Sequence, residues 1–248
     1  MIDDGEGFDV RSLAATFRTG ALVGVHQHRW GQLVYARSGL MRVGTEETLW
    51  LVPPTRAIWV PAGFQHSIAI SGEVAMRTLY IANDRAGQLP SDVRVLAVSP
   101  LLRELIVHIV GIGMLAPARP EHDRLAGLLI DLLVDSKPHD VSLPLPSDAR
   151  GKRMADEVQR NPCARDLSEL AQLTGASLRT LQRVFPRETG MTLEAWRQKA
   201  RLLHAVAGLS AGATVTETAL DCGYQSLAAF IAAFSKHFGI TPGRYLVG

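Results

Sequence analysis

Three histidines and one glutamine in the first third of the sequence have the types and spacing of metal ligands. His26 and His28 are two residues apart, so both side chains lie on the same face of a strand. Gln32 keeps that face if the strand stays regular, and His66 comes from a later hairpin. Three imidazoles and an oxygen donor suit Ni, Zn, Fe, Cu or Mn. The four residues therefore predict either a divalent transition-metal site or a polar lining that binds an organic effector directly.

Strands must position these ligands. Before Pro90 the chain consists of short alternating apolar segments separated by Gly, Pro and Ser, a spacing typical of an antiparallel sandwich or barrel. After Pro90 the apolar residues adopt helical intervals over 100–112 and 121–134. We expect these two helices to pack on the β domain, to form a homodimer interface, or both.

Two motifs in this half resemble those of the cupin superfamily, a small β-barrel. Residues 20–39 fit G-x5-H-x-H-x3-[E/Q]-x6-G, and residues 61–66, PAGFQH, fit P-x-G-x2-H. Gln32 replaces the usual glutamate, and Ile70 replaces the common asparagine. A site of three histidines and one glutamine has no anionic ligand, so it should hold a divalent metal less tightly than a site with a carboxylate. Four aromatic residues are expected to line the effector pocket or to belong to the barrel core: Trp30, Tyr35, Trp50 and Trp59.

The C-terminal part contains two helix-turn-helix patterns. In the first, about 167–186, a short helix ends at Gly175 and Ser177 is a natural N-cap for the next helix. The second, about 215–236, repeats this order around Gly223, and a long amphipathic segment over 193–209 joins the two. One such unit alone is also compatible with an ordinary helical hairpin, but a second copy favours DNA binding.

Over residues 150–248 the sequence resembles the AraC/XylS family of bacterial transcription regulators. The resemblance implies a seven-helix domain whose two recognition helices enter successive major-groove segments on one face of DNA. The matching residues are Leu181-Gln182-Arg183, Phe185, Gly190, Trp196, Arg201-Leu202, Ala205, Gly223-Tyr224, Ser226, Phe230, Phe234, Phe238-Gly239 and Thr241-Pro242.

Carried over by position, the first recognition helix offers Arg179, Gln182 and Arg183 as base readers. Arg can bridge guanine, and Gln can bridge adenine, in bidentate fashion. The second helix departs from this chemistry with Leu227, Ala228, Ala229 and Ala232, so it contacts thymine methyls, lies mainly on phosphates or binds loosely. The alternative role of Arg201 is a structural ion-pair partner, and the alternative role of Ser226 is the N-cap of the second helix. The remaining candidates for phosphate contact or for the second unit are Thr180, Arg187, Lys199, Arg201, Gln225, Ser226, Ala229 and Lys236.

The charge balance changes sign along the chain. The 248 residues carry a formal charge of +2, but residues 1–149 hold 13 basic and 16 acidic side chains, and residues 150–248 hold 13 and 8. Such asymmetry favours nucleic-acid contact by the basic part. We therefore predict a barrel over 1–90, a helical signalling segment over 91–138, a linker over 139–149 and a DNA-binding domain over 150–248.

These features predict a multidomain α+β protein, with a cupin barrel and helical hairpin followed by an all-α DNA-binding domain. Its expected role is a cytoplasmic, homodimeric transcription regulator that senses a metal or small molecule, binds double-stranded promoter DNA and contacts RNA polymerase. The acidic N-terminus has no signal-peptide pattern, no apolar run reaches membrane-spanning length, and Cys163 and Cys222 are too few for a disulfide framework. A cupin metalloenzyme with a DNA-binding tail, and a regulator whose barrel only dimerises, are the alternatives. Catalysis is not expected because no clear general acid or base accompanies the motifs.

Overall fold

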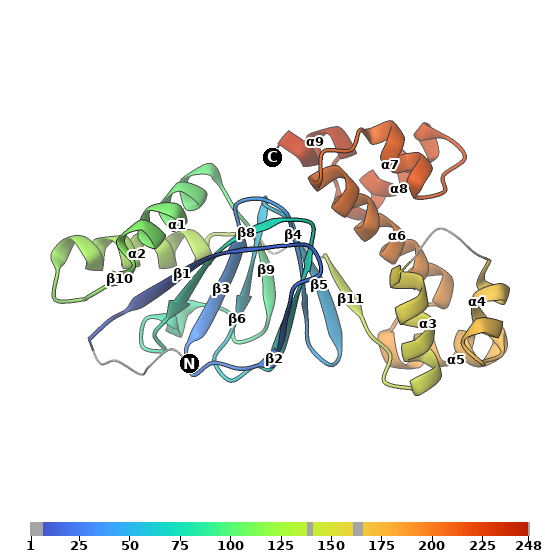
Figure 1. Cartoon of the computed structure of the whole chain (residues 1–248), viewed down its shortest axis with the longest axis horizontal. Helices are drawn as coiled ribbons and strands as arrows, with labels where there is room; N and C mark the ends of the chain where they lie inside the picture. Colours follow the sequence, from blue (N-terminus) through green and yellow to red (C-terminus); the bar gives the residue numbers. More distant parts are fainter. Residues whose placement is uncertain (1–6, 138–140, 161–165, 248) are drawn as a thin grey trace. The chain divides into compact units, whose positions relative to one another are not determined.

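The computed structural model describes residues 7–137, 141–160 and 166–247, and the chain divides into two compact units (Figure 1). The first unit contains the chain up to Val43 and from Val52 to Asp140. The second contains Gly44–Leu51 and the chain from Val141 onward. Cys163 and part of the predicted linker lie outside the described residues.

A six-stranded antiparallel sheet forms one layer of the first unit, in the order β10-β1-β8-β3-β6-β9. The segment expected to be helical over 91–138 supplies both edge strands, β9 and β10, as well as its two helices. The strands are β1 (Val10–Phe17), β3 (Gly31–Ala36), β6 (Arg56–Val60), β8 (Val74–Ile81), β9 (Arg94–Ala97) and β10 (Met114–Leu115).

A second sheet provides the other layer. Within the first unit, β7 (His66–Ser71) lies between β4 (Leu40–Gly44) and β2 (Leu22–His26). The β2–β7 register shifts at an irregularity before His26, which brings this residue directly opposite His66. The sequence motif alone gives no indication of this shift, which sets the position of the histidines.

Helices α1 (Pro100–Ile112) and α2 (Pro120–Val134) cover one face of the six-stranded sheet (Figure 1). Ser99 caps α1 by accepting from the Leu102 amide, and proline occupies the start of both helices, where a missing N–H costs nothing. Leu105 and Leu129 of the helices share a buried core with Leu33 and Leu79 of the sheet. The predicted packing of this hairpin on the β domain is thus confirmed.

The second unit is mainly helical. Its hairpin strands β5 (Thr48–Val52) and β11 (Ser142–Pro144) pair antiparallel. Among the described residues, seven helices follow: α3 (Ala149–Arg160), α4 (Leu167–Leu173), α5 (Leu178–Thr189), α6 (Leu193–Ser210), α7 (Val215–Asp221), α8 (Leu227–Phe238) and α9 (Pro242–Val247).

Helix α6 contributes to the cores of both helix-turn-helix units. Near its start, Trp196 packs against Phe185 of α5, and further along, Leu202 and Leu209 join a core with Phe230 of α8. The turns use glycines in the left-handed region, with φ of +66° at Gly175 and +69° at Gly223. Glycine adopts this conformation without steric cost, so the predicted turns are confirmed.

Candidate metal centre and DNA-binding helices

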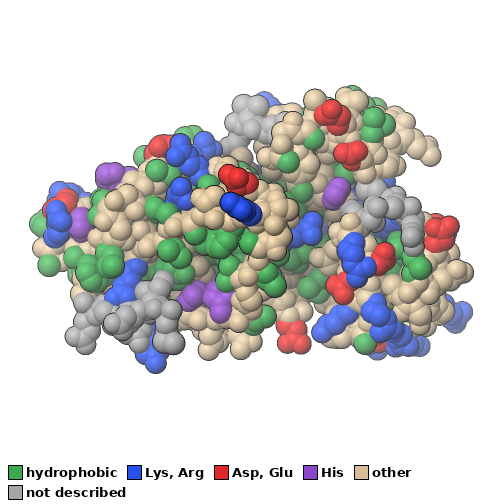
Figure 2. All heavy atoms as spheres, in the orientation of Figure 1, with side chains coloured by type: hydrophobic (Ala, Val, Ile, Leu, Met, Phe, Trp, Pro, Cys, Tyr) green, Lys and Arg blue, Asp and Glu red, His purple; other side chains and the backbone are tan. Residues whose placement is uncertain are grey.

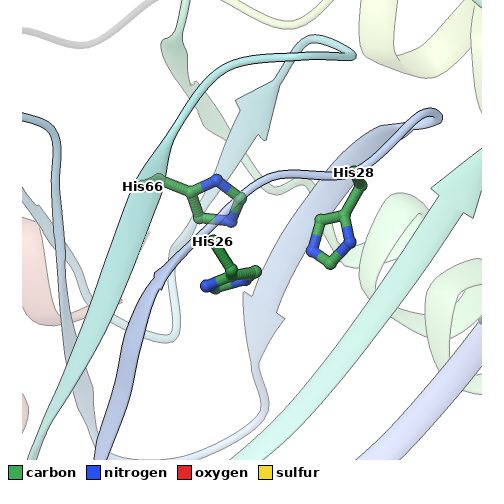
Figure 3. A group of neighbouring side chains, drawn as sticks. All are labelled: His26, His28 and His66. Carbon is green, nitrogen blue, oxygen red and sulfur yellow. The ribbon is translucent and has the colours of Figure 1, made fainter. Parts of the chain in front are cut away.

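His26, His28 and His66 converge on one small volume (Figure 3). His26 ends β2 and His66 begins the paired strand β7, while His28 follows two residues after β2. The ring centroids of His26 and His66 are 4.3 Å apart, and those of His26 and His28 are 4.8 Å apart. One nitrogen from each ring can be chosen so that all lie within 4.8 Å of one another. The structure thus brings the three predicted histidines together.

Backbone carbonyls orient two of these rings. The Nδ1 atom of His26 lies 2.7 Å from the Gly24 oxygen, and Nδ1 of His66 lies 3.0 Å from the Phe64 oxygen. An Nδ1–H that donates to a carbonyl leaves the Nε2 lone pair for a metal, which is how metal-binding histidines are commonly held. Within the described part of the chain, the buried Nε2 of His28 has no hydrogen-bond partner.

Gln32 approaches the cluster from the opposite sheet. Its amide nitrogen donates to Thr78 Oγ1 at 3.0 Å and to Tyr80 Oη at 3.2 Å. The Thr78 hydroxyl donates its proton to the Leu33 carbonyl, so Oγ1 can only accept from the Gln32 amide nitrogen. This chain of bonds turns Gln32 Oε1 toward His66 Nε2, 2.9 Å away.

Burial keeps His28 and His66 neutral near pH 7. Burial, followed by the neighbouring His26 and His66, lowers the pKa of His28 from 6.5 to about 4. Burial also lowers the pKa of His66, although its bond to the Phe64 carbonyl opposes the shift. Because burial raises the pKa of Tyr80, this phenol stays protonated. Unprotonated imidazoles have lone pairs available for a cation.

Thr78 and Tyr80 are site residues that the sequence analysis missed. They alternate on β8 and face Gln32 across the β3–β8 ladder, where Gln32 lies opposite Tyr80. Their two-residue spacing was visible in the sequence, but the register that brings them beside Gln32 was not. Tyr80 also contacts the ring of His28, with 4.9 Å between centroids.

Four aromatic residues were expected to line the pocket or to belong to the core. For Tyr35 and Trp59 the pocket role is wrong. Both are buried in the core beneath α1 and α2, because strand alternation turns them away from the Gln32 side. Trp59 is further fixed by its indole N–H, which donates to the Pro90 carbonyl at 2.8 Å. Trp30 lies beneath the Arg11 guanidinium at 4.9 Å, and Trp50 belongs to the hairpin of the second unit.

The α4–α5 pair forms a helix-turn-helix with a polar outer face. Ser177 Oγ caps α5 by accepting from the Thr180 amide at 3.1 Å. Arg179, Gln182 and Arg183 are exposed at the i, i+3 and i+4 positions that share one helix face. On the face shown in Figure 2, Lys and Arg side chains gather over α3–α5. This arrangement suits insertion of α5 into a major groove.

Comparisons with known proteins agree with this geometry. Residues 10–153 match the family described as AraC-like ligand binding domain, and residues 170–247 match a helix-turn-helix domain. The HTH-type transcriptional regulator NimR of Escherichia coli (strain K12) is 36% identical over 223 residues, which cover 90% of this chain and 81% of NimR. This chain belongs to the AraC family of transcriptional regulators.

Further relatives of this AraC-family regulator match in part or at lower identity. RipA of Corynebacterium glutamicum is 31% identical over 106 residues, 42% of this chain and 32% of RipA. Unsaturated fatty acid-bound ToxT from Vibrio cholerae is 11% identical, with 99% of this chain and 97% of that chain covered and a TM-score of 0.39. A probable AraC family regulator from Rhodopseudomonas palustris is 32% identical, with coverages of 39% and 93% and a TM-score of 0.35.

The AraC-family regulator has an N-terminal ligand-binding domain and a helix-turn-helix domain that binds promoter DNA. The matched family indicates that the N-terminal domain binds a ligand. No helix in the described ranges is both long and apolar enough to span a bilayer.

Two of the predicted phosphate contacts of this AraC-family regulator are wrong. The Lys199 side chain is only 7% exposed, so it does not reach the surface where DNA would lie. Arg201 donates through Nε to the Cys222 carbonyl at 3.0 Å, and its guanidinium lies 4.9 Å from the Tyr224 ring centroid. Arg201 therefore fixes the turn between α7 and α8 through a backbone carbonyl and an aromatic ring rather than through the predicted ion pair.

The other predicted DNA contacts lie at the surface or in helix caps. Arg187 is exposed and pairs with Glu188 at 2.6 Å. Thr180 shares a 2.8 Å bond with the capping Ser177, and Ser226 caps α8 by accepting from the Ala229 amide. Gln225, Ala229 and Lys236 are exposed.

Proposed function

We propose that this regulator senses its effector between the two sheets, where His26, His28, His66 and Gln32 bind a divalent transition metal. The two cupin-like motifs and the facing antiparallel sheets support a cupin-type sensor. The proposal rests chiefly on one observation, namely that both ring nitrogens of His66 face hydrogen-bond acceptors.

Those two contacts would need two N–H donors, but the neutral imidazole of His66 has only one. One nitrogen faces the Phe64 carbonyl, and the other faces Gln32 Oε1, whose orientation Thr78 fixes. Neutral imidazole carries one N–H, so one of its lone pairs must oppose an acceptor lone pair. A second proton is disfavoured because burial lowers the His66 pKa. A cation bound by Nε2 and Oε1 resolves the conflict, since ligands at about 2 Å from one ion lie about 3 Å apart.

The donor set also indicates the class of metal. Imidazole nitrogens suit Zn, Cu, Fe and Ni, and the amide oxygen adds a hard donor that Mn also accepts. Within the described residues, the cluster contains histidines and no carboxylate. A bound divalent ion would keep its full positive charge there and would supply a Lewis-acidic anchor for a small-molecule effector.

Metal analysis tests this site. We expect His66→Ala to weaken metal binding by about tenfold, since even loss of an outer partner costs that much. Purified chains are equilibrated with Zn(II) or Ni(II), desalted and measured by mass spectrometry for metals. His108→Ala is the matched control because His108 is an exposed histidine outside the cluster, and Gln32→Glu should tighten binding by adding an anionic ligand. Equal metal content in wild type and His66→Ala would leave direct recognition of an organic effector as the function of the site.

We propose that α1 and α2 also form a homodimer interface. Leu101, Ile112 and Leu128 are 57%, 38% and 40% exposed, and exposed apolar side chains that form a patch mark interaction sites. A surface groove of about 600 Å³ adjoins them, lined by His108, Ile112, Arg119, Glu121, His122, Arg124, Leu125 and Leu128.

Light scattering coupled to size exclusion tests the dimer. We expect Leu128→Glu to convert a dimer into a monomer, because a buried charge at an apolar interface costs several kcal/mol. Leu173→Glu, at a leucine 58% exposed on α4, should leave the mass unchanged. A monomeric wild type at micromolar concentration would contradict the interface.

We further propose RNA polymerase as a partner, the cytoplasm as the location and regulation without catalysis. Regulators among the relatives support these assignments, and in the part of the chain that the structure describes the histidine cluster includes no carboxylate. Effector binding must favour one arrangement of the two units, since a ligand without differential affinity shifts no equilibrium.

A further inference from the structure

Helices α5 and α8 are equivalent elements of a repeated unit. Both contain 12 residues, both are capped by a serine, and both end at a glycine in the left-handed region, with φ of +70° at Gly190 and +73° at Gly239. Counted from the caps Ser177 and Ser226, the fully buried Phe185 of α5 corresponds to the fully buried Phe234 of α8. The exposed face of α8 therefore corresponds to the base-reading face of α5.

The chemistry of the two faces is opposite. The positions held in α5 by Arg179 and Arg183 are held in α8 by Ala228 and Ala232, both exposed. From Leu227, 41% exposed, to Phe234 every residue of α8 is apolar. The basic residues of this helix are confined to its last turn. On the face shown in Figure 2, few basic side chains lie over α7 and α8.

A DNA recognition helix without polar side chains can still read one feature of the major groove. Thymine presents a C5-methyl group there, and alanine makes favourable apolar contact with it. Both A·T and G·C pairs would bury donor and acceptor groups without partners under this face, but only the A·T pair offers a methyl group that offsets the cost. The short alanine side chains also allow the helix to approach the base edges closely.

We propose that α8 specifies its half of the operator by contacting thymine methyl groups through Ala228, Ala229 and Ala232, whereas α5 reads its half through hydrogen bonds. The inference starts from the family's DNA-binding domain and assigns the bases that this second helix selects. The operator should therefore have an A·T-rich segment, with thymines oriented toward α8, about one helical turn from the segment read by α5.

Uracil substitution tests the proposal because it removes only the methyl group. A duplex is first selected from a randomised pool by the intact protein, and each thymine is then replaced by uracil in turn. We expect affinity to fall about fourfold for each contacted methyl, the value of one buried methyl-sized group. The fall should be confined to one half of the site.

Protein variants assign that half to α8. The double variant Ala228→Gly/Ala232→Gly should lose the uracil penalty at the thymines that these two alanines contact. Ala233→Gly carries the helix-propensity cost of one such glycine on the half-buried side and should retain the penalty. Arg183→Ala in α5 should also retain it. The proposal is overturned if every uracil duplex binds within twofold of the thymine duplex, or if the penalty is the same in wild type and in the Ala228→Gly/Ala232→Gly protein.

Discussion

Replacing Trp196 with alanine is expected to lower the free energy of unfolding of the DNA-binding unit by about 3–5 kcal/mol, the usual cost of truncating a buried tryptophan. The side chain is fully buried, and its ring packs edge-on against Phe185 with 5.2 Å between centroids. Its indole N–H donates to the Pro144 carbonyl at 2.6 Å, so truncation also removes a hydrogen bond. Trp196 thus joins α6, α5 and the end of β11.

Urea unfolding followed by far-ultraviolet circular dichroism measures this loss. Trp196→Phe keeps an aromatic ring but not the N–H donor, so it should lose less stability than Trp196→Ala. Leu173→Ala removes an exposed leucine from α4 and should stay within about 0.5 kcal/mol of wild type. If Trp196→Ala unfolds at the same urea concentration as wild type, the proposed role of this residue in the core is incorrect.

The helical half was predictable because its signals are local. Helices α4 and α7 begin at Leu167 and Val215, where the two patterns were expected to start, and they end shortly before the turn glycines Gly175 and Gly223. The wrong predictions in this half concern basic side chains that are buried or bonded to the backbone. The sequence shows that Lys199 and Arg201 are basic, but only the folded α6 shows that one is buried and the other binds the Cys222 carbonyl.

The site between the sheets was predictable only in part. The three imidazoles were predictable because the two motifs that hold them resemble those of the cupin superfamily, although His66 lies far from His26 and His28 in the sequence. The partners of Gln32 depend on which residues of β8 lie opposite β3, and strand register is a long-range property. For the same reason the sequence left open whether Tyr35 and Trp59 line the pocket or belong to the core, where the structure places them.

The positive charge of the C-terminal part is divided unequally between its two recognition helices. Of the two helix-turn-helix units, the first presents arginines on its recognition helix, whereas the second presents alanines. Phosphate attraction and hydrogen-bonded base reading therefore fall mainly to α5 and its neighbours. Loss of one α5 arginine should consequently have a large effect on DNA binding.

Replacing Arg183 with alanine is expected to lower the affinity for operator DNA about 10- to 100-fold, because a bidentate arginine–guanine contact is worth about 1–3 kcal/mol of discrimination. Arg183 is exposed on the same helix face as Gln182, whose amide now donates to Glu194 Oε1 at 3.2 Å and would exchange that bond for a base edge. Arg183→Lys should recover only part of the loss, since an ammonium group cannot make the planar two-bond contact.

Gel shifts with the DNA upstream of its own gene and with random DNA, at several salt concentrations, measure this effect. Arg183→Ala should lose affinity for the upstream DNA and little for random DNA, because base contacts carry the specificity. Arg187→Ala is the contrasting variant, since a phosphate contact should weaken both DNAs alike and reduce the salt slope by about one. Equal losses on both DNAs for Arg183→Ala would make Arg183 a phosphate contact and would leave Arg179 and Gln182 as the base readers of α5.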